Sequence, residues 1–145
     1  MAYVLNPHAR SPARALGLAG LIPFVGLTVA MHAGHWPQGL VALAQLAYGA
    51  TIVSFIGALH WGLAMRDPSL NSSALWRALG WGVMPSLLAP LETGLWMLCA
   101  TVPACWWMDA RLSGALALER WYLQLRTLLS AVVTVCLGAS ALALH

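Results

Sequence analysis

Long apolar stretches dominate the chain, and charged residues interrupt them at only a few positions. After Arg14 no charged residue occurs until Arg66, which leaves room for two helices with a turn near His32–Pro37. A helix needs roughly 20 apolar residues to cross a hydrocarbon core of about 30 Å. On that basis the pattern predicts helices at residues 15–33, 38–65, 74–91, 93–108 and 123–144. The predicted fold is an all-α polytopic membrane bundle of five transmembrane helices, formed by a single integral-membrane domain over residues 1–145.

The arginines predict how this bundle is oriented, because basic residues that flank membrane spans are retained on the cytoplasmic side. With five spans, one side receives every arginine of the chain, namely Arg10, Arg14, Arg66, Arg77, Arg111, Arg120 and Arg126. The N-terminus is therefore expected in the cytoplasm and the C-terminus in the periplasm. The segments 74–91 and 93–108 are also compatible with a re-entrant hairpin, since both are short and contain Pro85 and Pro103.

The composition supports a membrane location and excludes a soluble enzyme. The chain is 61% hydrophobic and only 8% charged, whereas an ordinary soluble domain is about 25% charged. Its three cysteines, Cys99, Cys105 and Cys136, fall within predicted spans and have no C-x-x-C spacing. Neither a disulfide framework nor a metal site is therefore expected.

The predicted helix at 38–65 carries polar residues on one face. Gln38, Gln45, Tyr48 and His60 lie within about a third of its circumference at 100° per residue. A polar stripe on an apolar helix faces protein or water rather than lipid. We therefore consider Gln45, Tyr48, His60 and Trp61 candidate residues for binding a quinone or a lipid. The alternative is a structural seam, in which these groups bond to neighbouring helices.

The predicted helix at 123–144 carries small residues at four-residue spacing. Ser130, Thr134 and Gly138 lie on one face, and small residues at that spacing allow helices to approach closely. This face is expected to pack against another helix, and it is a candidate surface for other membrane-protein subunits.

At the cytoplasmic boundary, tryptophans and arginines occur together in a pattern typical of an aromatic belt. Arg66, Arg77, Arg111, Arg120 and Arg126 are expected to bind anionic lipid headgroups there. Asp109 and Glu119 lie on the same side and are expected to pair with some of these arginines, within a polar loop at residues 109–120.

Four short runs follow one another along the chain, namely GLIPF at residues 20–24, GALHWG at 57–62, MPSLLA at 84–89 and WYLQLR at 121–126. In this order they resemble the transmembrane protein 69-like family, a domain of unknown function found in proteobacteria and mitochondria. The resemblance implies a small multi-span inner-membrane protein. It carries over no catalytic residue.

The chain has no G-x-S-x-G, H-E-x-x-H or phosphate-binding glycine motif, so we expect no enzymatic activity. We expect a non-enzymatic, multi-pass protein of the bacterial inner membrane that serves as an accessory or assembly subunit of a larger complex, such as a respiratory or energy-transducing one. It interacts with the lipid bilayer and not with nucleic acid. The alternative is a protein that binds or transports a lipid-soluble molecule, such as a quinone, in a cleft lined by helix 38–65. No cofactor is expected beyond such a bound lipid or quinone.

Overall fold

A computed structural model describes residues 10–66, 71–73, 76, 79–80, 94–116 and 119–145. The predicted helix at 74–91 lies almost entirely outside these described residues. Within them the structure is helical and contains no strand. Its helices are α1 (Arg10–Ala19), α2 (Ile22–Ala33), α3 (Gln38–Arg66), α5 (Leu95–Leu116) and α6 (Arg120–Ala143).

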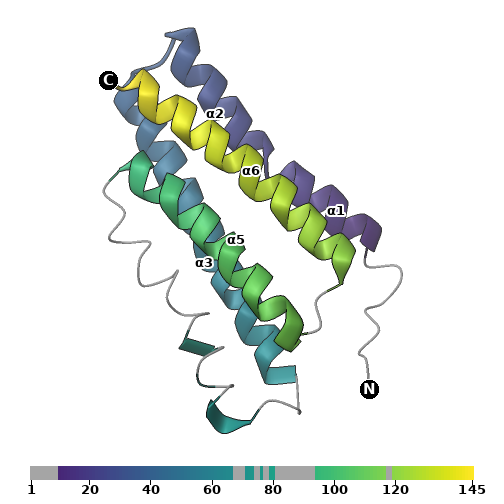
Figure 1. The fold of residues 1–145 in the computed structure, drawn as a ribbon. Helices are drawn as coiled ribbons and strands as arrows, with labels where there is room; N and C mark the ends of the chain where they lie inside the picture. Colours follow the sequence, from purple (N-terminus) through teal and green to yellow (C-terminus); the bar gives the residue numbers. More distant parts are fainter. Residues whose placement is uncertain (1–9, 67–70, 74–75, 77–78, 81–93, 117–118) are drawn as a thin grey trace.

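The helices form an elongated bundle in which neighbouring elements run along one another (Figure 1). α6 packs against both α2 and α5, and α3 packs against the same two helices from the other side. α2 and α6 run in one direction, whereas α3 and α5 run in the opposite direction (Figure 1). Three segments among the described residues are long and apolar enough to cross a membrane, namely Arg10–Ala33, Gln38–Leu59 and Arg120–Ala143.

The first of these segments is not one continuous helix. It breaks at Gly20 and Leu21, where the Leu21 amide donates to the Leu18 carbonyl at 3.0 Å in a tight turn. Pro23 follows near the start of α2, where its missing N–H matters least. The proline thus starts a new helix instead of interrupting one, and the break separates α1 from α2.

The core lies where α2, α3, α5 and α6 meet. Phe24, Met31, Val53, Leu98 and Leu137 are fully or almost fully buried there. Gly49 allows the closest approach, because an added Cβ at this position would lie 2.1 Å from Cδ2 of Leu98. A glycine in α3 therefore admits a leucine of α5 into the centre of the bundle.

The sequence pattern predicts the bounds of α3 and the start of α6 closely, but it predicts the end of α5 poorly. The predicted helix at 38–65 coincides with α3, and α6 begins three residues before the predicted start at 123. α5, however, continues to Leu116, so the loop predicted over residues 109–120 is wrong for residues 109–116. The physical reason is that Asp109, which we expected to end the span, is buried in a contact with α6.

Candidate functional site

Two of the candidate residues on α3, Gln45 and Tyr48, face α2. The Tyr48 hydroxyl donates to the Gly20 carbonyl at 3.0 Å, and its ring lies 5.0 Å from that of Phe24. The break between α1 and α2 therefore receives a hydrogen bond from α3 at the residue where the first helix ends. Tyr48 fixes the relative position of these three helices.

Gln45 takes part in a cluster of three polar side chains that joins α2, α3 and α6, here called the Thr28 cluster (Thr28, Gln45 and Ser140). Gln45 Nε2 and Ser140 Oγ each lie 3.2 Å from Thr28 Oγ1, which accepts a bond from both. Thr28 Oγ1 in turn donates to the Phe24 carbonyl at 2.8 Å. Gln45 and Ser140 have no exposed surface, so these bonds form in the interior of the bundle.

In the Thr28 cluster, the hydroxyl group of Thr28 forms all the hydrogen bonds that it can, but one acceptor atom of Gln45 has no donor. Thr28 Oγ1 accepts two hydrogen bonds, and its single proton lies between the carbonyls of Phe24 at 2.8 Å and Cys136 at 3.3 Å, which uses the capacity of a hydroxyl. Gln45 Oε1 is buried and has no hydrogen-bond partner among the described residues. A buried carbonyl oxygen without a donor costs about 1–3 kcal/mol. Gln45 thus contributes a bond between helices at some cost in stability.

The other two candidates are located less completely. His60 lies in α3, but its side chain is outside the described part of the structure. Trp61 is exposed, and its Nε1 donates to the Leu79 carbonyl at 2.9 Å. The structure therefore does not bring Trp61 together with Gln45 and Tyr48, which lie more than a dozen residues earlier on the same helix.

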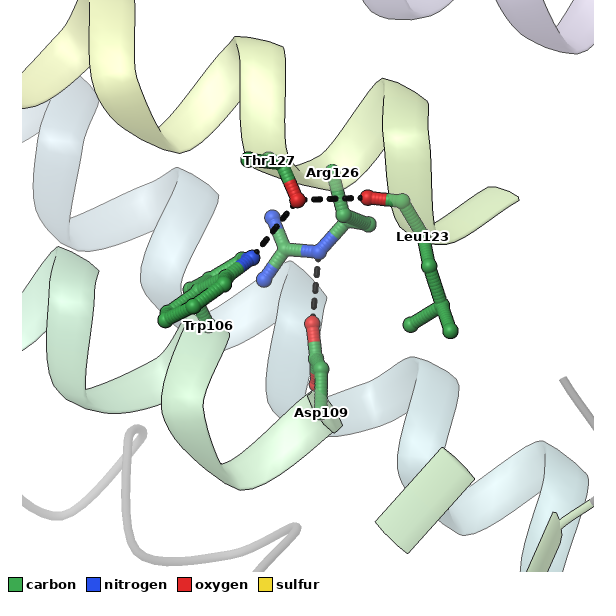
Figure 2. Close-up of polar contacts among 5 residues, drawn as sticks. All are labelled: Trp106, Asp109, Leu123, Arg126 and Thr127. Carbon is green, nitrogen blue, oxygen red and sulfur yellow. Dashed lines mark hydrogen bonds and ion pairs between the residues drawn. The ribbon is translucent and has the colours of Figure 1, made fainter. Parts of the chain in front are cut away.

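A second polar contact joins α5 to α6 and is an ion pair. Arg126 Nε lies 2.6 Å from Asp109 Oδ2, and the two side chains are only 9% and 2% exposed. Figure 2 shows the guanidinium of Arg126 pointing from α6 towards Asp109 on α5. Three residues earlier in α5, Trp106 Nε1 donates to Thr127 Oγ1 at 2.9 Å, and Thr127 Oγ1 donates to the Leu123 carbonyl (Figure 2). The prediction that Asp109 pairs with an arginine is confirmed.

The small-residue face of α6 packs inside the chain, against α5. Ser130 is buried, and the Cys99 thiol donates to the Thr134 carbonyl at 3.5 Å. A Cβ at Gly138 would lie 3.9 Å from Cys99 Sγ. The expected close packing of this face is present, but its neighbour is a helix of the same chain. On this face Ser130 is buried, whereas Thr134 and Gly138 are half-buried.

Two arginines rest on tryptophan rings at the end of the bundle where α6 begins. Arg111 Cζ lies 4.1 Å from the centroid of Trp107 on α5, and Arg10 Cζ lies 6.0 Å from that of Trp121 on α6. Arg126 differs from these arginines, because it is buried and paired with Asp109. The side chains of Arg66 and Arg77 lie outside the described residues.

These contacts are those of a helical membrane protein whose polar side chains mainly hold its helices together. The sequence stripe identified Gln45 and Tyr48, but it missed Thr28, the partner of Gln45, and Ser140, which bonds to the same Thr28 hydroxyl. Isolated hydroxyl residues within apolar helices gave the only signal for those partners.

The family assignment agrees with this class. A model of a family described as proteins of unknown function, DUF3429, matches residues 9–142, and the chain belongs to this family. Transmembrane protein 69 of Xenopus tropicalis is 46% identical over 85 residues, which cover 56% of this chain and 32% of that protein. Transmembrane protein 69 of Mus musculus is 36% identical over 76 residues, covering 46% of this chain and 31% of that protein.

The chain therefore matches about a third of the length of these two relatives. No solved structure matches it. The family and these relatives identify a multi-pass membrane protein of unknown function, in agreement with the resemblance found in the sequence.

Proposed function

We propose that the protein is a non-enzymatic accessory or assembly subunit of a larger membrane complex in the bacterial inner membrane. The observation that supports the proposal is that polar side chains of α3 form hydrogen bonds with neighbouring parts of the bundle. Gln45 bonds to Thr28 on α2, and Tyr48 bonds to the Gly20 carbonyl in the turn before α2. Such bonds define the shape of the bundle and leave its outer surface apolar, as a subunit embedded among lipids and other helices requires.

The same contacts weigh against the alternative of a quinone or lipid cleft lined by α3. A ligand bound to Gln45 would have to enter a position that has no exposed surface and is already bonded to Thr28. A ligand bound to Tyr48 would compete with its bond to the Gly20 carbonyl. Ligand binding at these two residues would therefore require the contact between α2 and α3 to open.

For the membrane topology, we infer five spans, with the N-terminus in the cytoplasm and the C-terminus in the periplasm. The arginines support the orientation, and two contacts support the number of spans, because they agree with α5 running parallel to α3 and antiparallel to α6. Leu98, near the start of α5, packs at Gly49 in the first half of α3, whereas Asp109 near the other end of α5 pairs with Arg126 near the start of α6. With 22 residues, α5 is about 33 Å long, which is sufficient to cross a hydrocarbon core.

The subunit proposal predicts that one outer face contacts a specific protein. A diazirine amino acid would be placed at exposed positions on separate faces, in cells that produce the protein at its native level. Suitable positions are Val29 on α2, Phe55 on α3 and Val135 on α6, which are 62%, 61% and 70% exposed. Leu98, which is fully buried, serves as the matched control and is expected to cross-link only within the chain.

The expected result is a protein adduct of defined mass at one of these faces, accompanied by comigration of the chain with that partner in a mild detergent. Lipid adducts alone at all three exposed positions, together with a chain that migrates by itself, would contradict the subunit role.

A further inference from the structure

The end of the bundle where α6 begins has four exposed arginines, named here the arginine end (Arg10, Arg14, Arg111 and Arg120). Figure 1 shows the start of α1, the end of α5 and the start of α6 together at this end. The contact of Arg10 with the Trp121 ring joins α1 to α6 directly. These arginines therefore come from three helices but share one end of the molecule.

Two carboxylates lie near this end. Asp109 is 2% exposed and pairs with the buried Arg126. Glu119, next to Arg120, accepts a hydrogen bond from Trp121 Nε1 and keeps its negative charge. Among the described residues, no ion pair joins a carboxylate to any arginine of the arginine end. The arginine end therefore has an excess of positive charge, because Glu119 offsets only part of its four arginines.

The contact between Arg111 and Trp107 holds one of these guanidinium groups in a position from which it can bind an anion. A guanidinium that lies over an aromatic ring uses its flat face for the contact. Its N–H groups point outward in the plane, where they match the two oxygens of a phosphate group. Trp107 is itself 48% exposed, so this pair lies on the surface of the bundle. The ring restricts the side chain of Arg111 before any anion binds, which lowers the entropy lost on binding.

We propose that the arginine end binds the phosphate groups of anionic phospholipids, with Arg111 on Trp107 as its best organised site. Lipid is the favoured occupant because these arginines and tryptophans lie at the ends of apolar helices, at the depth where headgroups begin. The complementary charge is abundant there, since anionic lipids attract basic side chains that flank membrane spans. This proposal does not depend on the accessory role.

The test is a titration of the purified full-length protein in neutral detergent micelles with phosphatidylglycerol or phosphatidylcholine, with bound lipids counted by native mass spectrometry. The wild-type protein is expected to retain phosphatidylglycerol in preference to phosphatidylcholine. Arg111→Gln is expected to weaken phosphatidylglycerol binding about fivefold, the typical contribution of one basic residue near an anionic surface. Arg111→Lys, which retains the charge but not the planar group, is expected to lie between Arg111→Gln and the wild type.

A pair of tryptophan variants separates the proposed site from a general effect of aromatic residues. Trp107→Leu is expected to weaken binding about threefold through loss of the stacked ring. Trp96→Leu is the matched control, because Trp96 lies on the same helix near its opposite end and is 50% exposed. It is expected to leave phosphatidylglycerol binding unchanged.

Equal retention of the two lipids by the wild-type protein would overturn the proposal, and the arginine end would then be a candidate for an acidic protein surface. An equal loss of binding in Trp96→Leu and Trp107→Leu would also overturn it, as would normal binding by Arg111→Gln. Circular dichroism of each variant establishes that the helices are intact, and the exposed position of Arg111 makes its variants compatible with folding.

Discussion

Replacing Asp109 with asparagine should destabilise the protein more than any surface change at the same end of the bundle. The substitution removes the negative charge that lies 2.6 Å from Arg126 Nε. Arg126 then becomes a buried cation without a counter-charge, a change that typically costs 3–5 kcal/mol. Arg126 is six residues from the start of α6, so about 9 Å of helix separates it from that end. Its long side chain can extend partly towards the headgroups. We therefore expect the lower part of the range, about 3 kcal/mol, which is roughly a hundredfold change in the unfolding equilibrium.

Reversible unfolding by sodium dodecyl sulfate in mixed micelles, followed by tryptophan fluorescence, measures this loss of free energy. The double variant Asp109→Leu with Arg126→Met removes both charges and is expected to lie within about 1 kcal/mol of the wild type. Arg120→Gln is the control, since Arg120 is exposed on the first residue of α6, and its effect should stay below about 0.5 kcal/mol. A loss under about 1 kcal/mol for Asp109→Asn, or a double variant no more stable than Asp109→Asn, would refute the reasoning.

Three further substitutions can be followed by the same unfolding measurement. Gly49→Ala should lower the free energy of unfolding by about 1–3 kcal/mol, because the added Cβ would meet buried Leu98. Gly26→Ala is the control, since there is open space around Gly26, and it should not destabilise the protein. Equal effects of the two substitutions would contradict the packing argument. Thr28→Val should lower the free energy of unfolding by about 1–3 kcal/mol, because Gln45 and Ser140 would lose the oxygen that accepts their hydrogen bonds. An unchanged stability would mean that the Thr28 cluster does not form. Tyr48→Phe should cost about 0.5–1.5 kcal/mol through the lost bond to the Gly20 carbonyl, and no loss would argue against that bond.

The ends of the helices could be predicted from the sequence where an uninterrupted apolar run meets a proline or a charge. α3 is the best case, since Pro37 precedes it and Arg66 is its last residue. The same rule failed at Asp109, where a charge lies inside a helix. Whether a charged residue ends a span or is buried depends on a partner 17 positions away, Arg126, and no local pattern contains that information.

The candidate site was predictable to a similar extent. Helical periodicity placed Gln45 and Tyr48 on one face of α3, and the structure places both against α2. The periodicity did not reveal that Gln45 bonds to Thr28 or that Ser140 joins them, because a single hydroxyl residue in an apolar helix often bonds to its own backbone, as Thr51 does. Contacts between helices depend on how the helices are rotated and shifted, which the one-dimensional pattern leaves undetermined.

The break at Gly20 and Leu21 has a consequence for how the protein fits into bilayers of different thickness. The segment Arg10–Ala33 has 24 residues and is about 36 Å long, which exceeds a hydrocarbon core of about 30 Å. α2 is anchored by buried Phe24 and Met31, whereas α1 has no buried residue. In a thinner bilayer the excess length can therefore be accommodated by tilting α1 about the turn at Gly20 and Leu21. This tilt would open the contact between Arg10 and Trp121, while α2 keeps its contacts with α3 and α6.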